Sequence, residues 1–447
     1  MRNHADIVAE LLNRWPENRV APTLGRVAAL LDLLGSPHRS APVVQIAGTN
    51  GKGSTAIMVD ALLRSAGLRT GRFTSPHLSD VTERICIDGR PIETDRFDEL
   101  WTSVRPLVEI VDEQRIDGVR MTFFEVVTCL AFAAFADAPV DVMVLEVGLG
   151  GTWDATNAAD ADVAVVCPVD LDHRHILGDT VAEIAGEKAG IIKPGSTAVL
   201  AGQQPEAAAV LLARCAEVGA PALREGIDFG LLDRTPAVGG QVIRVLGAGG
   251  PIPDLFLPLH GAHMAANAAL AVAAAEALLG GRALAAEVVA DGLADVRAPA
   301  RLELVRTSPP VVLDTAHNPH GVRATLAAVN EAYGFAPTIG VLAMMRDKDA
   351  AGVLALLEPE IGTLVVTGMR DVDRAYAAAE LAELAAEAFG ADRVRVAPSM
   401  QDAIEVAVEL ADEDGPGAGV LIVGSVIAAG EARTLLVKDE GADDAAS

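Results

Sequence analysis

The sequence predicts an α/β fold: a doubly wound parallel-sheet N-terminal domain with a small β excursion, followed by a smaller Rossmann-like C-terminal domain. Three observations predict it. Short, β-branched apolar runs alternate with Ala- and Leu-rich stretches along most of the 447 residues. The apolar runs are continuous, as expected for strands that are buried on both faces of a parallel sheet. A second strand–helix series begins after a break near Ala298–Arg301.

The alternation places each element in turn. Strands are expected at Val43–Ala47, Val140–Val147, Asp162–Pro168, Thr197–Ala201, Val311–Asp314, Thr338–Ala343, Thr363–Thr367 and Val420–Gly424. Helices are expected at Lys52–Ala66, Phe123–Asp137, Val181–Lys188, Glu206–Val218, His263–Leu279, His320–Ala332, Arg374–Phe389 and Met400–Asp412. A Gly- and Pro-rich stretch, 221–258, interrupts the rhythm and predicts a small antiparallel excursion. We therefore expect two domains, 1–297 and 298–447.

Composition and charge limit the possible partners. Apolar residues make up 51% of the chain and aromatic residues 3%, so the core must consist of Ala, Val, Leu and Ile. The net charge of −27 gives no general attraction for nucleic acid or anionic lipid, and neither is expected as a partner. The four cysteines form no CxxC motif, which argues against a zinc site. The polar start lacks a signal peptide and no apolar run reaches the ~18 residues that span a bilayer, so we expect a cytoplasmic protein.

A phosphate-binding loop is predicted between the first strand and the first helix. Its residues are Gly48, Thr49, Asn50, Gly51, Lys52, Gly53 and Ser54. The glycines allow the backbone N–H groups to turn inward, and the helix N-terminus favours an anion. Lys52 would reach the β- and γ-phosphates and the Ser54 hydroxyl would ligate Mg²⁺. An ordinary glycine-rich turn is the alternative, but the position together with Lys52 and Ser54 favours an enzyme that uses Mg-ATP.

Three further side chains are expected near this loop. Glu146 ends a buried strand, where a carboxylate can hold Mg²⁺ beside the phosphates; capping of a helix is the alternative. His173 follows the next strand and would lie at the same edge, although such a histidine is often structural. Lys188 lies on the following helix, in a chain with only five lysines. From the sequence alone, Lys188 could equally be a surface cation.

At this point the motifs resemble a known family over nearly the whole chain. They are Gly48–Ser54, Ser75–Leu78, Glu83–Ile85, Thr122–Glu125, Glu146–Asn157, His173, Glu187–Lys193, Pro299–Glu303, Asp314–Pro319, Asp347–Asp349 and Gly424–Ser425. Their residues and order resemble folylpolyglutamate synthase / dihydrofolate synthase, of the Mur ligase superfamily. Several of the motifs are short, but their joint order is specific.

The resemblance implies ATP-driven amide formation. A carboxylate of dihydropteroate or a reduced folate would take the γ-phosphoryl group of ATP, and the amine of L-glutamate would attack the resulting acyl phosphate. Two Mg²⁺ ions are implied, K⁺ is a further candidate ion, and the superfamily suggests a monomer. Which carboxylate is used stays open. One chain could add glutamate to both dihydropteroate and a folate, or it could carry out folylpolyglutamate synthesis alone.

The resemblance also implies roles for residues. The catalytic set is Lys52, Glu146, His173 and Lys188. The metal ligands are Ser54, Ser75, Glu146, His173 and Lys188, where Lys188 matches a carbamylated lysine. ATP would contact Gly48–Ser54, Asn267, Arg301 and Asp314. The other substrates would contact Ser75, His77, Arg84, Thr122, Phe124, Asp154, Ala155, His317 and Ser425. For Phe124, a place in the helix core is an equally good reading of the residue alone.

The sequence differs from the family at several positions, and two other classes of nucleotide-binding protein are alternatives. Many family members have Arg-Leu where this chain has Thr152-Trp153, and Thr315 replaces a common glycine. A peptidoglycan Mur ligase would carry an extra N-terminal domain, whereas fewer than ~50 residues precede Gly48. A P-loop switch protein would need neither the second domain nor the pair His173 and Lys188.

Overall fold

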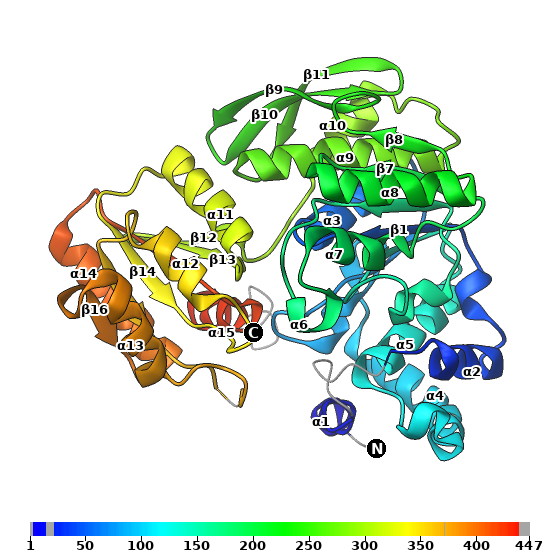
Figure 1. The fold of residues 1–447 in the computed structure, drawn as a ribbon, viewed down its shortest axis with the longest axis horizontal. Coiled ribbons are helices and arrows are strands. Elements are labelled where there is room, and N and C mark those ends of the chain that lie inside the picture. Colours follow the sequence, from blue (N-terminus) through cyan, green and yellow to red (C-terminus); the bar gives the residue numbers. More distant parts are fainter. Residues whose placement is uncertain (1–2, 15–21, 371, 438–447) are drawn as a thin grey trace, which may run out of the picture. The chain divides into compact units, whose positions relative to one another are not determined.

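The computed structural model describes residues 3–14, 22–370 and 372–437, and the chain forms two compact units (Figure 1). The first unit comprises Met1–Pro258 and His263–Val296, and the second comprises Leu259–Ala262 and Arg297–Ser447. Each unit is built around its own sheet, so the predicted α/β class is confirmed. Within the described ranges, none of the helices combines the length and hydrophobicity required of a transmembrane segment.

The first unit contains an eight-stranded sheet in the order β4-β3-β2-β5-β1-β6-β7-β8. Its strands are β1 (Val43–Ala47), β2 (Thr70–Phe73), β3 (Ile85–Ile87), β4 (Arg90–Pro91), β5 (Val142–Glu146), β6 (Val163–Val166), β7 (Thr197–Leu200) and β8 (Ala222–Arg224). The run from β2 to β8 is parallel, while β3 and β4 form an antiparallel edge. The expected parallel sheet therefore carries two extra edge strands.

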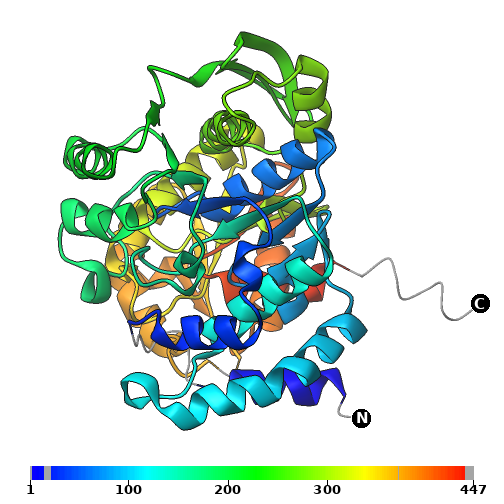
Figure 2. The ribbon, with the colours of Figure 1, turned by 90° about the vertical axis from the view of Figure 1, so that its right-hand side faces the viewer.

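Helices cover both faces of this sheet, as a doubly wound fold requires. They are α1 (His4–Leu12), α2 (Gly25–Leu33), α3 (Lys52–Ser65), α4 (Thr94–Gln114), α5 (Phe123–Asp137), α6 (Arg174–Leu177), α7 (Val181–Ala189), α8 (Pro205–Val218), α9 (Ala262–Leu278) and α10 (Ala286–Ala294). Helices α2, α4 and α5 enclose one core, with α1 lying beside α4 (Figure 2), and α7 and α8 enclose another. Helix α3 packs on β1, β2 and β5 and is covered by α10.

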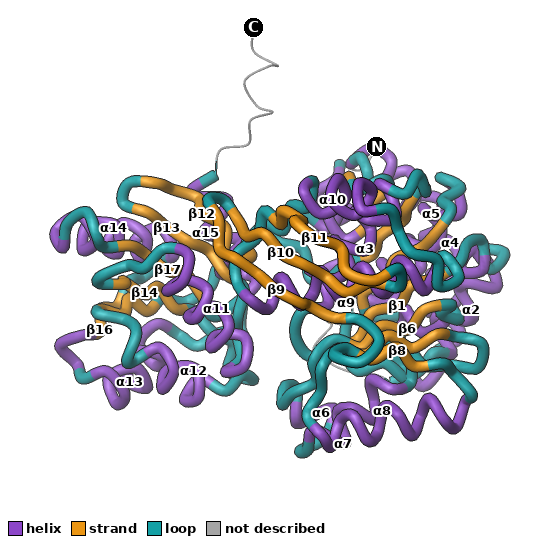
Figure 3. Tube along the Cα trace, turned by 90° about the horizontal axis from the view of Figure 1, so that it is seen from above, coloured by secondary structure: helices purple, strands orange, loops and turns teal. Residues whose placement is uncertain are grey.

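The excursion forms a separate three-stranded antiparallel sheet, as predicted. Its strands are β9 (Gly230–Ala237), β10 (Gly240–Gly247) and β11 (Gly250–Leu257). Figures 1 and 3 both show this ribbon beside α9 and α10. The excursion begins later than expected, because β8 pairs in parallel with β7 and so belongs to the main sheet.

The second unit contains a six-stranded sheet in the order β12-β13-β17-β14-β15-β16. Its strands are β12 (Arg301–Thr307), β13 (Pro310–Asp314), β14 (Thr338–Leu342), β15 (Thr363–Val366), β16 (Val394–Val396) and β17 (Gly419–Val423). Its helices are α11 (Pro319–Ala332), α12 (Ala350–Leu357), α13 (Ala378–Phe389), α14 (Met400–Asp414) and α15 (Val426–Leu436). Among the strands described for this unit, only β12 is antiparallel to its neighbour. Helices α11, α12 and α13 share one core with the sheet, while α14 and α15 pack against its strands and each other.

The topology of the first unit brings three loops together. Strands β5, β1 and β6 are adjacent and parallel, so their carboxyl ends lie at one edge. The loops that leave this edge begin at Val147, Gly48 and Cys167 respectively. The chain turns from β1 to β2 on one side and reaches β6 on the other, which makes this edge a topological switch point. Ligands of open α/β sheets bind at such points.

Candidate active site

The phosphate loop requires glycine at two positions. Gly48 has φ of +149°, and a Cβ there would lie 2.5 Å from the Cβ of Cys167. Gly51 has φ of +87°, and a Cβ there would lie 2.8 Å from Oδ1 of Asn267 on α9. Both backbone conformations are strained for any residue with a side chain. The loop is therefore compressed between β6 and α9, which brings the predicted Asn267 directly to it.

The loop is also tied to the chain that follows β6. The Thr49 hydroxyl donates to the Asp170 carbonyl at 2.9 Å and accepts from the Asp170 backbone N–H at 3.0 Å. The Thr49 N–H donates to the Pro168 carbonyl at 3.0 Å. Thr49 was expected to contact ATP, and in the structure its hydroxyl and its backbone N–H fix the loop to the segment that leads to His173.

Two lysine ammonium groups converge on one carbonyl of the loop. Lys52 Nζ donates to the Gly48 carbonyl at 3.1 Å and to the Thr49 carbonyl at 3.3 Å. Lys188 Nζ, from α7, donates to the same Gly48 carbonyl at 2.8 Å. Lys188 is only 4% exposed. Its burial and the nearby Lys52 charge lower the pKa of Lys188 to about 7, so a neutral amine is available near neutral pH.

A carboxylate and a hydroxyl lie beside the loop. Glu146 at the end of β5 is buried, and its Oε2 accepts from the Ser75 N–H at 2.9 Å. A Cβ on Gly53 would lie 3.3 Å from that same oxygen, so Glu146 contacts the first turn of α3. Ser54 is buried on that turn. These oxygen donors fit Mg²⁺, which needs only one or two carboxylates when phosphate oxygens complete its shell.

His173 has a left-handed backbone, with φ of 50° and ψ of 37°, immediately before α6. Its N–H donates to Asp172 Oδ1 at 2.8 Å, and its Nε2 lies 3.9 Å from that oxygen. The side chain is 33% exposed, so it can reach a ligand. The structure thus places His173 on the segment that Thr49 anchors, at the carboxyl end of β6.

The next group of predicted residues surrounds Arg84. Its Nε donates to His77 Nδ1 at 2.8 Å, and its guanidinium lies 5.0 Å from the Phe123 ring centroid. Burial and the Arg84 charge lower the pKa of His77 to about 4. Because Nδ1 accepts from Arg84, the neutral ring must carry its proton on Nε2. His77 is therefore a hydrogen-bond donor at neutral pH.

Helix α5 begins at a rigidly held point. Thr122 and Glu125 form a reciprocal capping box, and Glu125 also makes a two-point ion pair with Arg26 of α2. The two distances of this pair are 3.0 and 2.7 Å, and Arg26 is 1% exposed. Phe124 packs so closely on Gly148 that a Cβ there would lie 2.5 Å from the ring. The Phe124 ring is thus fixed against the loop that follows Glu146.

Asp154 organises that same loop. Its carboxylate accepts from the Leu149 N–H at 2.9 Å, from the Thr156 N–H at 2.9 Å and from the Thr156 hydroxyl at 2.6 Å. Burial raises the pKa of Asp154, although these hydrogen bonds act in the opposite direction. The Gln45 side chain donates to Thr156 at 3.0 Å and so joins the loop to β1. Ala155 is buried within this arrangement.

In the second unit, the predicted residues gather at the carboxyl ends of β13 and β17. Asp314 accepts from the N–H groups of Leu302 and Ala316 and from the Thr325 hydroxyl, at 2.8–3.0 Å. Arg301 donates to the Thr315 hydroxyl. The glycine that is common at this position has no side chain and could not accept this hydrogen bond. The other two predicted residues are His317, whose Nδ1 lies 3.0 Å from the Thr315 carbonyl, and Ser425, which caps α15.

Several residues that shape the site were not given roles from the sequence. Arg26 is one, because a single arginine in an amphipathic helix carries no signal of its buried partner. Asn157 and Lys193 are two more, and they connect the loop after β5 to the end of α7. Both occur within motifs that the sequence singled out, which was the available signal.

Comparisons with known proteins show the family to which this chain is similar. The family model described as the Mur ligase middle domain matches residues 46–275, and the Mur ligase glutamate ligase domain matches 300–426. A Mycobacterium tuberculosis protein named dihydrofolate synthase/folylpolyglutamate synthase is 48% identical, over 95% of this chain and 92% of its own. A Bacillus subtilis protein of the same name is 34% identical, over 91% and 93%.

Solved structures of folylpolyglutamate synthases are also similar to this chain. The Mycobacterium tuberculosis folylpolyglutamate synthase complexed with ADP superposes with a TM-score of 0.94 at 47% identity, covering 98% of both chains. An FPGS–AMPPCP–folate complex superposes with a TM-score of 0.85 at 31% identity, covering 98% of this chain and all of that one. On these grounds the chain belongs to the folylpolyglutamate synthase / dihydrofolate synthase family of Mur ligases.

Proposed function

We propose that this protein is an ATP-dependent carboxylate–amine ligase that joins L-glutamate to the carboxylate of a pterin or folate. The observation that carries the proposal is the convergence of Lys52, Lys188 and Glu146 on the phosphate loop. Family membership gives the reaction class, and relatives whose names and complexes include ATP analogues and folate support the substrates. Products are the amide, ADP and phosphate.

In the proposed reaction, the substrate carboxylate oxygen attacks the γ-phosphorus of ATP and ADP leaves, which gives an acyl phosphate. The amine of glutamate then attacks the acyl carbon, loses a proton, and expels phosphate. The loop N–H groups and Lys52 would stabilise the charge on the transferring phosphoryl group. The Arg84–His77 pair and Phe124 would form the wall for the pterin, with His77 Nε2 as a donor. We assign ATP and pterin binding to 1–297 and glutamate ligation to 298–447.

Mg²⁺ would be held by Ser54, Ser75 and Glu146, with His173 at a second ion. When bound, Mg²⁺ neutralises charge on the phosphate oxygens and orients them. Lys188 has the properties that carbamylation requires, because its pKa of about 7 leaves much of the amine neutral at physiological pH. The amine would attack CO₂, form an N–C bond and release one proton. Intact mass of the active enzyme that shows a bare Lys188 amine would contradict this.

Asn267 would contact the adenine side of the nucleotide, while Arg301 and Asp314 would contribute to nucleotide binding from the second unit. His317 and Ser425 would lie near glutamate. A site for K⁺ and action as a monomer also stay predictions. Replacement of K⁺ by Na⁺ in the assay and light scattering of the purified protein test these two points.

We propose that one chain performs both reactions, addition of glutamate to dihydropteroate and extension of a reduced folate. The relatives from Mycobacterium tuberculosis and Bacillus subtilis both carry the double name. The test is to incubate purified protein with ATP and L-glutamate and with each acceptor separately, and to measure phosphate and the glutamylated product. If the folate is glutamylated and dihydropteroate is not, the protein is a folylpolyglutamate synthase without dihydrofolate synthase activity. Phosphate release that is independent of both acceptors and of glutamate would favour a nucleotide switch and overturn the proposal.

A further inference from the structure

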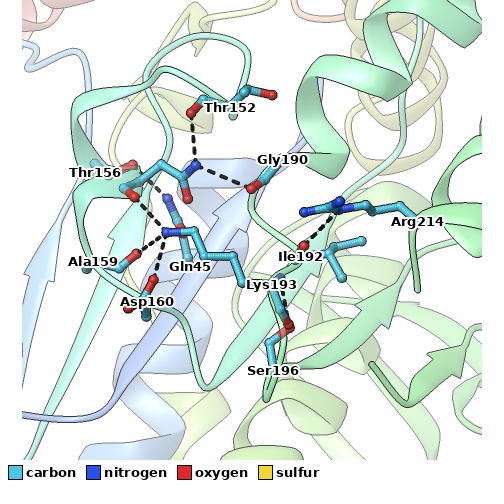
Figure 4. A network of polar contacts seen from close by, with 11 residues as sticks. Gln45, Thr152, Thr156, Ala159, Asp160, Gly190, Ile192, Lys193, Ser196 and Arg214 are labelled. Carbon is cyan, nitrogen blue, oxygen red and sulfur yellow. Dashed lines mark hydrogen bonds and ion pairs between the residues drawn. The ribbon is translucent and has the colours of Figure 1, made fainter. Parts of the chain in front are cut away.

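Lys193 is the one lysine of the Glu187–Lys193 motif whose place the proposed reaction does not explain. It lies four residues after the end of α7, and its side chain is 21% exposed. Its ammonium donates to the carbonyls of Asn157 and Ala159 at 2.7 and 2.9 Å and to Asp160 Oδ1 at 3.0 Å. All three donors of the ammonium group are therefore used. Figure 4 shows this group pointing into the backbone turn that precedes β6.

Asn157 extends the connection in the opposite direction. Its side chain is buried, and Nδ2 donates to the carbonyls of Thr152 and Gly190 at 3.0 and 3.3 Å. Both contacted atoms are carbonyl oxygens, so the nitrogen rather than the oxygen of the amide must face them. Lys193 thus fixes the backbone of Asn157, and the Asn157 side chain then joins the loop after β5 to the segment after α7.

This junction brings two backbones into direct contact. A Cβ on Gly151 would lie 2.6 Å from the Glu187 carbonyl and 3.1 Å from Cα of Lys188. A Cβ on Gly190 would lie 2.2 Å from the Thr152 hydroxyl. The Thr152 N–H also donates to the Glu187 carbonyl at 3.0 Å. The backbone of Lys188 therefore rests on this loop, and its ammonium reaches Gly48 from there.

We propose that Lys193 and Asn157 are positioning residues that hold Lys188 against the phosphate loop. The proposal rests on the function proposed above, because it assigns these residues to the phosphoryl-transfer step through Lys188. Apart from the bond from Lys193 to Asp160 Oδ1, their contacts are to backbone carbonyls on both sides of the Gly151–Lys188 junction. Loss of the Lys193 ammonium would remove three hydrogen bonds that lie outside the site itself, and it would let the end of α7 shift relative to Gly48.

The chain offers a matched control. Arg214 on α8 donates from Nε to the Ile192 carbonyl at 3.1 Å, one residue before Lys193 (Figure 4). It is a cation bound to a backbone carbonyl of the same segment, but it approaches from α8 and contacts neither Asn157 nor Thr152 through any hydrogen bond that the described residues show. Lys193→Met and Arg214→Met therefore remove comparable groups from two sides of one segment.

The experiment measures steady-state kinetics and amine labelling of the full-length protein. For Lys193→Met we expect kcat to fall by about tenfold or more, with little change in the KM for ATP, because a small misplacement of a catalytic group has effects of this order. Lys193→Arg, which can donate to the same carbonyls, should recover much of the rate, and Arg214→Met should behave as the wild type. Acylation of amines in buffers free of CO₂ and bicarbonate, where Lys188 is not carbamylated, followed by peptide mass analysis, should show Lys188 protected in the wild type and in Arg214→Met, and labelled faster in Lys193→Met.

Unchanged kcat and a protected Lys188 in Lys193→Met would overturn the proposal, as would equal losses in Lys193→Met and Arg214→Met. If Lys193→Met does not accumulate as folded protein, Lys193→Gln, which keeps a donor, takes its place with the same expected order of effects. A wild type that releases no phosphate with acceptor and glutamate would refute the proposed function, whereas the labelling comparison would still decide whether Lys193 holds Lys188.

Discussion

Replacing Lys188 with methionine is expected to stabilise the first unit at neutral pH and to do so less as the pH rises. The buried amine has a pKa of about 7 in the folded protein, against 10.5 for an ordinary lysine. In the unfolded chain the same amine is charged and hydrated. Between pH 7 and 10.5 the unfolded state therefore binds more protons than the folded state, so the free energy of unfolding increases with pH over this range.

The magnitude follows from the difference between the two pKa values. At about 1.4 kcal/mol per pKa unit, a fall from 10.5 to about 7 corresponds to roughly 3–5 kcal/mol of destabilisation at pH 7. Lys188→Met removes this entire contribution. It also removes the hydrogen bond to the Gly48 carbonyl, which costs about 1 kcal/mol at every pH. The net gain at pH 7 should be about 2–4 kcal/mol, and it should approach zero or reverse near pH 10.

Urea unfolding of the wild type and of Lys188→Met at several pH values between 7 and 9.5 measures this difference, in buffers free of CO₂ and bicarbonate so that the Lys188 amine is not carbamylated. Trp101 and Trp153 both lie in the first unit, so their fluorescence follows its unfolding. A difference between the two proteins that does not change with pH would refute the reasoning. So would a variant that is less stable than the wild type at pH 7, since burial of the amine would then carry no electrostatic cost.

Three further predictions concern ligands. Gly51→Ala should weaken ADP binding about tenfold or more in calorimetry, because the strained backbone costs about 1–3 kcal/mol and the new methyl group meets Asn267; unchanged affinity would contradict the tight loop. Gly148→Ala should raise the KM for the folate several-fold without changing ADP affinity, since its methyl group displaces Phe124; equal effects on both ligands would argue against a folate wall there. Chelation of Mg²⁺ should abolish phosphate release, and its return should restore it; activity that persists in excess chelator would count against the oxygen donors around Glu146.

The central elements of the fold could be predicted because their residues are apolar and continuous. Strand β1 and helix α5 have the predicted bounds, and both are almost wholly buried. The short edge strands β4 and β16 were missed because exposed residues carry no apolar signal. Strand β2 was missed because it contains Gly71 and Arg72. Glycine is needed there since a Cβ would lie 2.5 Å from the Phe135 ring.

The prediction of helices from the sequence was limited in the same way as that of strands. Helix α13 was predicted from Arg374 but begins at Ala378, because Ala377 has an extended backbone that Glu380 caps at 3.0 Å. Helix α4, the longest in the first unit, was not predicted. It mixes charged and apolar residues and contains Pro106, so its signal is weak until the amphipathic face is seen against α2 and α5.

The site was predictable where chemistry is local and not where contacts are distant. The phosphate loop could be recognised from seven consecutive residues. Glu146 could be placed beside it because the carboxyl ends of parallel strands lie at one edge of the sheet. The contact of Lys188 with Gly48 joins residues 140 apart, and no local pattern encodes it. The same is true of Arg26 with Glu125, 99 residues apart. Such pairs depend on how helices settle on the sheet.

The most direct test of the acyl-phosphate reaction traces one oxygen atom from the substrate carboxylate to the released phosphate. A folate acceptor that carries the heavy oxygen isotope at both oxygens of its reacting carboxylate is incubated with the enzyme, ATP, Mg²⁺ and L-glutamate, and the released phosphate is analysed by mass spectrometry. If the carboxylate attacks the γ-phosphorus beside Lys52 and Glu146, one heavy oxygen must appear in each phosphate released. Phosphate that contains no heavy oxygen, or that forms equally well without glutamate and acceptor, would contradict a ligase that works through an acyl phosphate.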